Sequence, residues 1–172
     1  AIQLANEAVT AKKPLAIALV GNVSDRYREA LKLNFIPDIV TDQTSAHDLH
    51  MGYIPSGLDL EQAKTLRKKN SAHYYQLIKE SLILHVEAMV TFKKRGAIVF
   101  EYGNNLRQQA YQAGYQQAFD LPGFAAEYLR SLYCEGRGPC RWIALSGDPG
   151  ESYKVDEIVL EEVKHDKRVA RR

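Results

Sequence analysis

The sequence predicts an α/β domain built on an open parallel sheet. Three short apolar runs, at residues 15–20, 39–41 and 97–100, have the length and composition of buried strands. Between them lie segments whose apolar residues recur at helical spacing. Residues 15–41 contain a strand, a helix and a second strand, which is a βαβ unit with parallel strands and a right-handed crossover.

The first part of the chain follows this alternation element by element. Residues 2–11 have helical spacing, and a basic pair followed by a proline ends that helix. The run at 15–20 is continuously apolar, which favours a strand buried on both faces. Ser24 is the candidate N-cap of a helix that extends to about Asn34, and the second strand follows at 39–41.

The second part begins with a long polar loop and two helices. Asp59 is placed to cap the first of them. The second is expected over about 71–95, with Gly96 as its C-cap, and the third strand follows at 97–100. The remaining predicted elements are helices at 105–113, 124–134 and 155–169 and a fourth, short strand at 141–145.

Length and composition indicate an ordinary globular protein. The chain has 172 residues, of which 45% are hydrophobic and 26% charged, and its formal net charge is +2. This charge gives no indication of a nucleic-acid or membrane partner, and no apolar run of about 18 residues is present to span a bilayer. Two cysteines, Cys134 and Cys140, are typical of a reduced, cytosolic protein, with a disulfide between them as the alternative.

Polar segments follow the three main predicted strands, at residues 21–22, 42–47 and 102–105. Because ligands of open parallel sheets bind beyond the carboxyl ends of the strands, we expect these segments to form one polar edge. Their amide and hydroxyl side chains suit ribose and phosphate oxygens, and Gly21 and Gly103 let the backbone approach a ligand closely. The sequence has no G-x-G-x-x-G fingerprint and no P-loop, so the pattern itself names no ligand.

Other chemically active residue types indicate structural roles. His47 is expected to donate a hydrogen bond in a ligand loop, and a metal pair of His47 and His50 lacks an evident third ligand. His85 lies on a helix face and is expected to be a packing or surface residue. Cys134 follows an apolar helix face without a neighbouring histidine, which favours a structural thiol over a nucleophile. No metal site is predicted.

Several long and unusual strings, in the same order along the chain, resemble the urocanase family. The longest is Asp42-Gln43-Thr44-Ser45-Ala46-His47-Asp48. The others include Val20-Gly21-Asn22, Gly52-Tyr53-Ile54-Pro55, Tyr102-Gly103-Asn104-Asn105 with Arg107-Gln108, Pro122-Gly123-Phe124, Gly138-Pro139 with Arg141-Trp142, and Ala144-Leu145-Ser146-Gly147-Asp148-Pro149. The resemblance covers residues 15–155, which is nearly the whole chain.

The resemblance implies a Rossmann-like parallel sheet with helices on both faces, of which this chain holds a part. It implies that residues 1–154 are the C-terminal part of an NAD-binding domain and that 155–172 are a helical extension toward a flanking domain. Urocanases are urocanate hydratases, which add water to urocanate to give 4-imidazolone-5-propanoate in histidine degradation, with NAD+ as a tightly bound electrophile. The resemblance therefore implies urocanate as substrate, NAD as cofactor, a cytoplasmic location and a homodimer.

Cofactor contacts of the family, carried onto the matching positions, fall at the same three strand ends and on the loop between them. They are Asn22, Val23, Gln43, Thr44, Ser45, Ala46, His47, Tyr53, Ile54 and Tyr102. No catalytic residue is expected here, because the family's active-site cysteine would lie beyond residue 172 and Cys134 matches a different cysteine. The family's Gly-Met-Gly loop would lie before residue 1, so we expect the 172 residues alone to be inactive and to bind NAD weakly or not at all.

Two alternatives have different functions. The first, from another class, is an α/β module that binds a ligand or a partner and performs no chemistry. The second is a stand-alone nucleotide-binding protein, against which the missing glycine-rich fingerprint counts.

Overall fold

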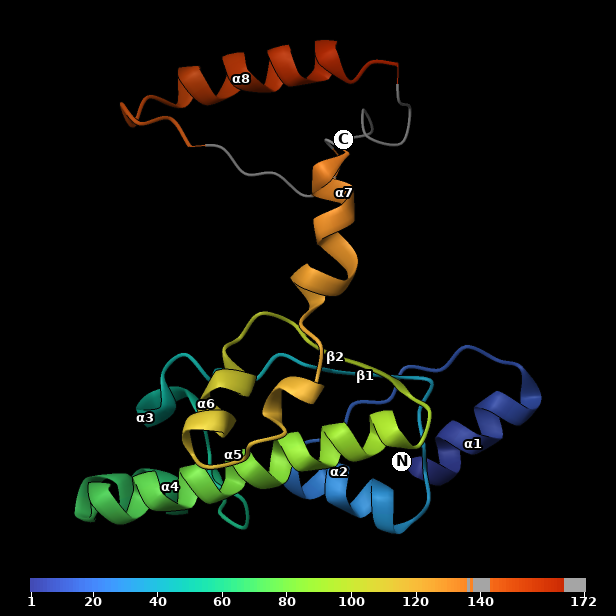
Figure 1. Cartoon of the computed structure of the whole chain (residues 1–172), viewed down its shortest axis with the longest axis vertical. Coiled ribbons are helices and arrows are strands. Elements are labelled where there is room, and N and C mark those ends of the chain that lie inside the picture. Colours follow the sequence, from blue (N-terminus) through green and yellow to red (C-terminus); the bar gives the residue numbers. More distant parts are fainter. Residues whose placement is uncertain (136, 138–142, 166–172) are drawn as a thin grey trace. The chain divides into compact units, whose positions relative to one another are not determined.

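The computed structural model describes residues 1–135, 137 and 143–165 of the chain. These residues fall into two compact units, Ala1–Arg130 and Ser131–Arg172. The first unit contains the sheet and most of the helices, and the second contains α8 (Pro149–Glu162). Each unit is described by itself below, and Figure 1 gives the labels of their elements.

A two-stranded parallel sheet lies at the centre of the first unit. Strand β1 (Ile39–Asp42) pairs with β2 (Ile98–Glu101) in a register that sets Val40 opposite Val99 and Asp42 opposite Glu101. Those four residues are buried, whereas Ile39 and Ile98 are exposed. The parallel pairing confirms the predicted α/β class, and both strands lie where the sequence predicts them to within one residue.

Helix α5 (Ser71–Lys94) forms the core of this unit. Its Tyr74, Ile78, Leu82, Val86 and Met89 recur every three or four positions and are each 0–1% exposed. Burying such side chains stabilises a fold by about 1.5–3 kcal/mol each. The helix packs against α2 (Val23–Lys32), α4 (Leu60–Lys69) and β2, and Figure 1 shows α5 in green beside α2 and α4.

The predicted cap of α4 is confirmed. The Asp59 carboxylate accepts a hydrogen bond from the Gln62 backbone N–H at 2.8 Å, and the Gln62 side chain accepts one from the Asp59 N–H at 3.0 Å. This reciprocal arrangement is a capping box, which satisfies two otherwise unpaired amide groups at the helix start. The other short elements are α1 (Ile2–Ala11), α3 (Leu49–Gly52), α6 (Leu106–Gln112), a 3₁₀ turn (Ala118–Asp120), a π-helical turn (Ala125–Leu129) and α7 (Arg130–Cys134).

The predicted strand at residues 15–20 is wrong for this structure. These described residues are irregular and exposed, and the Val20 side chain is fully open to solvent. A strand buried on both faces needs a neighbour on at least one edge and a layer above and below. Residues 15–20 have neither in the described part of the chain, so their apolar composition alone does not make them a strand.

Several predicted boundaries also need correction. Asn22, not Ser24, caps α2, because the Asn22 side chain accepts hydrogen bonds from the Ser24 and Asp25 N–H groups. The segment predicted as one helix over 124–134 begins as a π-helical turn.

In the second unit, residues 143–145 of the predicted fourth strand form no strand, and residues 141–142 lie outside the described part. The last helix begins at Pro149 because Asp148 caps it, accepting from the Gly150 N–H at 2.8 Å. The division predicted between residues 154 and 155 therefore falls inside α8.

Candidate functional site

A cleft of about 610 Å³ opens beside the carboxyl end of β1. Three segments line it: the start of α2, the loop that follows β1, and residues 52–60. Six of the ten residues expected to contact a cofactor lie on its wall, namely Asn22, Val23, Thr44, Ser45, Tyr53 and Ile54. The structure thus brings together residues that are as far apart in the sequence as Val20 and Leu60.

Asn22 joins two of these segments. Its side-chain oxygen caps α2, while its amide nitrogen donates to the carbonyl of Ile54 at 2.8 Å and to that of Pro55 at 3.3 Å. All the strong hydrogen-bonding capacity of this side chain is therefore used within the protein. Asn22 shapes the cleft by holding residues 54–55 against the first turn of α2.

Asp25 extends this clamp by one turn. Its carboxylate accepts hydrogen bonds from the Ser56 hydroxyl and from the Gly57 N–H, the latter at 3.0 Å. Burial raises the pKa of the Asp25 carboxyl, but these two hydrogen bonds and the nearby Arg28 and Arg26 lower it by more, so the net pKa lies below its ordinary value. The folded state therefore favours the charged form of Asp25.

The loop that follows β1 is organised by Asp42, which is 3% exposed. Its carboxylate accepts from the Thr44 backbone N–H at 3.2 Å, from the Thr44 hydroxyl at 2.9 Å and from the Asn104 side-chain amide. Asn104 also donates to the Thr44 carbonyl at 2.9 Å. These hydrogen bonds fasten the polar segment after β1 to the polar segment after β2, as the convergence of parallel strand ends predicts.

Gly52 is required where the two loops of the cleft meet. A Cβ at this position would lie 2.6 Å from the Ser45 Cβ and 2.7 Å from the Ser45 carbonyl oxygen. Both distances are far below van der Waals contact, so a larger residue would push the loops apart. The close approach places the Ser45 hydroxyl and the Tyr53–Ile54 segment on the same cleft wall.

Tyr53 lies between the cleft and the core. Its hydroxyl is 3.2 Å from His85 Nδ1, and its backbone carbonyl accepts a hydrogen bond from the Tyr74 hydroxyl at 2.8 Å. Burial raises the pKa of the Tyr53 hydroxyl well above its ordinary value, and the nearby Asp42 and Asp25 raise it further. His85, in turn, has its Nε2 3.5 Å from Asp42 Oδ1.

A second hollow of about 230 Å³ lies at the end of β2. His47 lines it, together with Gly103, Asn105 and the ion pair between Glu101 and Arg107, whose Oε2 and Nε are 3.0 Å apart. Glu101 is 3% exposed and also accepts from the Gly103 N–H at 2.9 Å.

Three expected cofactor contacts line neither hollow. Gln43 is exposed, Ala46 is fully buried beneath the loop, and the Tyr102 ring stacks on Phe124 with 4.6 Å between ring centroids. Whether all ten residues contact a cofactor stays a prediction.

Sequence reasoning missed Asp25, Asp42, His85 and Asn104 as organising residues. For Asp42 and Asn104 the signal was their place directly after a strand, and for His85 it was a titratable group on an apolar helix face.

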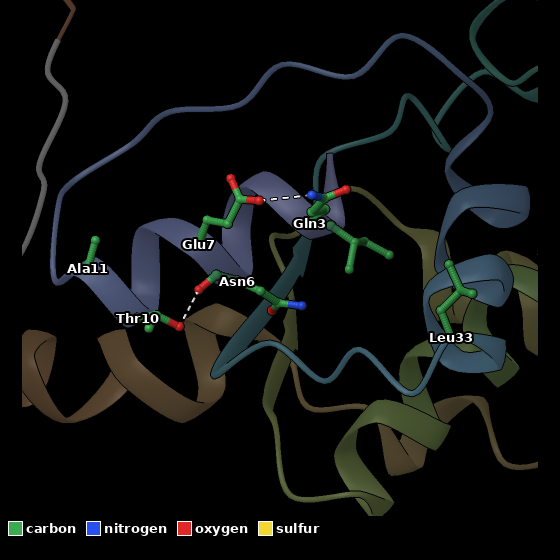
Figure 2. Close-up of a pocket in the computed structure, with 7 residues that line it drawn as sticks. Gln3, Asn6, Glu7, Thr10, Ala11 and Leu33 are labelled. Carbon is green, nitrogen blue, oxygen red and sulfur yellow. Dashed lines mark hydrogen bonds between the residues drawn. The ribbon is translucent and has the colours of Figure 1, made fainter.

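Another hollow, of about 710 Å³, is a poorer candidate and lies beside α1 (Figure 2). Its lining consists of Leu33 and of residues of α1, namely Ile2, Gln3, Asn6, Glu7, Thr10 and Ala11. Two of its side-chain donors bond within that helix: Gln3 to Glu7 at 2.9 Å and Thr10 to the Asn6 carbonyl at 2.8 Å. None of the ten residues of α1 is buried, so no rigid wall supports this hollow.

Two further questions concern membranes and metals. Among the described residues, no helix combines the length and the apolar character that a membrane span requires. Within the same residues, no three His, Cys, Asp or Glu side chains gather in a way that would hold a metal ion. His50 packs its ring on Tyr75 at 5.5 Å, and Cys134 is an exposed free thiol.

A parallel sheet with a cleft beyond the carboxyl end of a strand is typical of α/β proteins of the Rossmann-like class, which are generally nucleotide-binding. Comparison with known families agrees: residues 1–128 match the model of the urocanase Rossmann-like domain, and residues 131–172 match that of the urocanase C-terminal domain. The chain belongs to the urocanase family. The two matched regions divide the chain where its two compact units divide.

Proposed function

We propose that this chain is the cofactor-binding part of a urocanate hydratase, with NAD+ bound in the cleft beside β1. The observation that carries the proposal is the composition of this cleft. Six residues that match the family's cofactor contacts meet there from three segments, and Asn22, Asp25 and Asp42 hold those segments in place. Family membership supports the hydratase or lyase class for the reaction.

The charges around the cleft indicate which part of a dinucleotide it suits. Asp25 and Asp59 line it, and none of its described lining residues is a lysine or an arginine. A diphosphate would be repelled by these carboxylates, whereas ribose hydroxyls and an amide group would donate hydrogen bonds to them. We therefore propose that a nucleoside half of NAD+, rather than its diphosphate, occupies the cleft.

The roles of the chain's own residues in such a complex are binding and orientation. Bound NAD+ would supply an electrophilic ring, and the protein would fix that ring's position. Ser45, Tyr53 and Ile54 line the cleft, and Asp42 holds Thr44 so that its loop is ordered before a ligand arrives. We propose urocanate as the substrate, the cytoplasm as the location and a homodimer as the assembly of the native protein.

Calorimetric titration of the native protein with NAD+ tests the cofactor. Thr44→Ala tests the cleft, and Tyr102→Phe tests an expected family contact that lies outside it. Thr65→Ala and Tyr111→Phe are the controls, since Thr65 is exposed on α4 and Tyr111 is about as exposed as Tyr102. We expect saturable binding that Thr44→Ala weakens about tenfold, that Tyr102→Phe also weakens, and that the controls leave unchanged. Equal affinity of Thr44→Ala and the native protein would refute the placement of NAD+ in this cleft.

Conversion of urocanate tests the reaction. In the native protein, absorbance should report loss of urocanate that depends on bound NAD+, and the 172 residues alone should show none. A native protein that binds NAD+ but leaves urocanate unchanged would instead support a module without chemistry of its own.

A further inference from the structure

Three buried polar groups from three separate segments form a continuous series beneath the cleft. His85 of α5 is 0% exposed, and Asp42 of β1 and Tyr53 of the cleft wall are 3% exposed each. His85 Nδ1 is 3.2 Å from the Tyr53 hydroxyl, and its Nε2 is 3.5 Å from Asp42 Oδ1. Nε2 has no hydrogen-bond partner among the described residues, and the Asp42 carboxylate is the charged group beside it. Burying an imidazole on an apolar helix face costs free energy unless its nitrogens interact with other polar groups.

The position of the Asp42 carboxylate decides between the two neutral tautomers of His85. If Nδ1 carried the proton, the Nε2 lone pair would face a carboxylate oxygen across 3.5 Å, which is electrostatically repulsive. If Nε2 carries it, the nearby carboxylate attracts the N–H, although the two groups form no hydrogen bond, and Nδ1 is free to accept. The Tyr53 hydroxyl then donates to Nδ1 at 3.2 Å in preference to the Ser81 carbonyl at 3.5 Å.

We propose that His85, as the neutral Nε2–H tautomer, is a positioning residue that fixes the Tyr53–Ile54 wall of the cleft relative to the end of β1. The expected effect on cofactor affinity rests on the proposed function, whereas the contacts of His85 do not depend on it. Asp42 organises the loop on one side of the cleft through Thr44 and Asn104. Tyr53 belongs to the other side. His85 lies between Asp42 and Tyr53 and supplements the direct contact of the two loops at Gly52 and Ser45. Tyr74 of the same helix donates a hydrogen bond to the Tyr53 carbonyl.

The proposal has a pH dependence with a definite sign. The titratable groups that face His85 are Asp42 from β1, Tyr53 from the cleft wall and Tyr27 from α2, whose ring centroid is 5.6 Å away. Burial lowers the pKa of His85, and Asp42 opposes that shift. Protonation would make Nδ1 a donor and remove the acceptor of the Tyr53 hydroxyl. Because the pKa of His85 is lowered, cofactor affinity should stay constant down to about pH 6.5, the ordinary pKa of histidine, and should fall only at a lower pH, where the buried ring is protonated.

The first experiment measures the ring nitrogens of His85 by NMR in the ¹⁵N-labelled native protein without cofactor. We expect a neutral ring at pH 7.5 with the proton on Nε2. A proton on Nδ1, or a charged ring, would overturn the proposal. Because no cofactor is present, this result does not depend on whether the cleft binds NAD+.

The second experiment measures NAD+ affinity at pH 7.5 and pH 6.0 in matched variants. His85→Phe removes both ring nitrogens, Tyr53→Phe removes only the hydroxyl, and Met89→Ala, one turn along α5, removes packing alone. Met89 is 0% exposed, so its truncation should cost more stability than Tyr53→Phe. We expect at least tenfold weaker binding for His85→Phe, about fivefold for Tyr53→Phe, and no change beyond twofold for Met89→Ala.

The outcomes separate the two proposals. Equal loss of affinity in Met89→Ala and Tyr53→Phe would reduce His85 to a packing residue and overturn the inference. If His85→Phe does not fold, the comparison of Tyr53→Phe with Met89→Ala still decides between a positioning role and a packing role for His85. A native protein that shows the Nε2–H ring but binds no NAD+ would refute the proposed function and leave the tautomer established.

Discussion

The ends of β1 and β2 offer a comparison, because the same position of the sheet is stabilised in two ways. Asp42 and Glu101 are register partners, and each is 3% exposed. Asp42 is surrounded by neutral donors from Thr44 and Asn104 and by the His85 ring. Glu101 has a full cation, Arg107, at 3.0 Å. A buried carboxylate can thus be satisfied either by several dipoles or by one opposite charge.

The difference matters for the hollow that each carboxylate supports. Dipoles around Asp42 come from the loops that wall the larger cleft, so satisfying the carboxylate also orders those loops. Arg107 instead reaches across from α6 and donates to the Leu121 carbonyl at 3.2 Å, so it ties β2 to the segment that follows α6. The hydrogen bonds at the β1 end therefore shape a cleft, whereas the ion pair at the β2 end stabilises the packing of β2 against the segment that follows α6.

Arg107→Ala should have the largest effect on stability. It leaves Glu101 buried without its opposite charge, which typically costs 3–5 kcal/mol, and we expect about 3 kcal/mol because Arg107 is 26% exposed. Urea unfolding of the native protein would measure the loss. As a control, Arg28→Ala removes an ion pair of 4.0 Å in which neither side chain is buried, and it should cost less than about 1 kcal/mol. Similar losses for the two variants would remove the distinction between the strand ends.

Asp42→Asn tests the end of β1, as Arg107→Ala tests the end of β2. The amide that replaces one oxygen would face the donors of Thr44 and Asn104, which leaves polar groups unpaired at a cost of about 2 kcal/mol. We also expect a tenfold loss of NAD+ affinity, since the loop that Asp42 orders lies on the cleft. Glu101→Gln should lower the free energy of unfolding by about as much as Asp42→Asn, and it should weaken NAD+ binding no more than Asp42→Asn does. A larger loss of affinity in Glu101→Gln would reverse the roles assigned to the two ends.

The β1 and β2 ends also show what the sequence can and cannot predict. A run of apolar residues followed by polar ones marked both strands, and parallel pairing then placed Asp42 and Asn104 together. The pairing of His85 with Asp42 depends on how α5 crosses the sheet, which no local pattern encodes. Likewise, Asn22 was predicted at a strand end and lines the cleft, but its hydrogen bonds to the Ile54 and Pro55 carbonyls join residues 32 and 33 positions apart, which no local pattern encodes.

Asp25→Asn should have a smaller, pH-dependent effect. Because the folded-state pKa of Asp25 is lowered, its charged form adds stability that is fully present above the ordinary pKa of 3.8 and is lost as the pH falls through the folded-state value. We expect a cost of about 1 kcal/mol at pH 7 and a flatter decline of stability in acid. Asp38→Asn, at an exposed position before β1, is the control and should change neither. Parallel acid-unfolding curves for the native protein and Asp25→Asn would contradict the clamp.

Val20→Ala should have the smallest effect and tests whether a third strand end belongs in the comparison. Val20 ends the apolar run 15–20 just as Glu101 ends β2, yet its side chain is fully exposed, whereas Val99 is 3% exposed. Val99→Ala should therefore cost about 2 kcal/mol and Val20→Ala less than about 0.5 kcal/mol in urea unfolding. A loss in Val20→Ala as large as in Val99→Ala would mean that residues 15–20 are buried in the native protein. The apolar run would then be a strand after all, and the cleft that Val20 borders would have a third strand end on its wall.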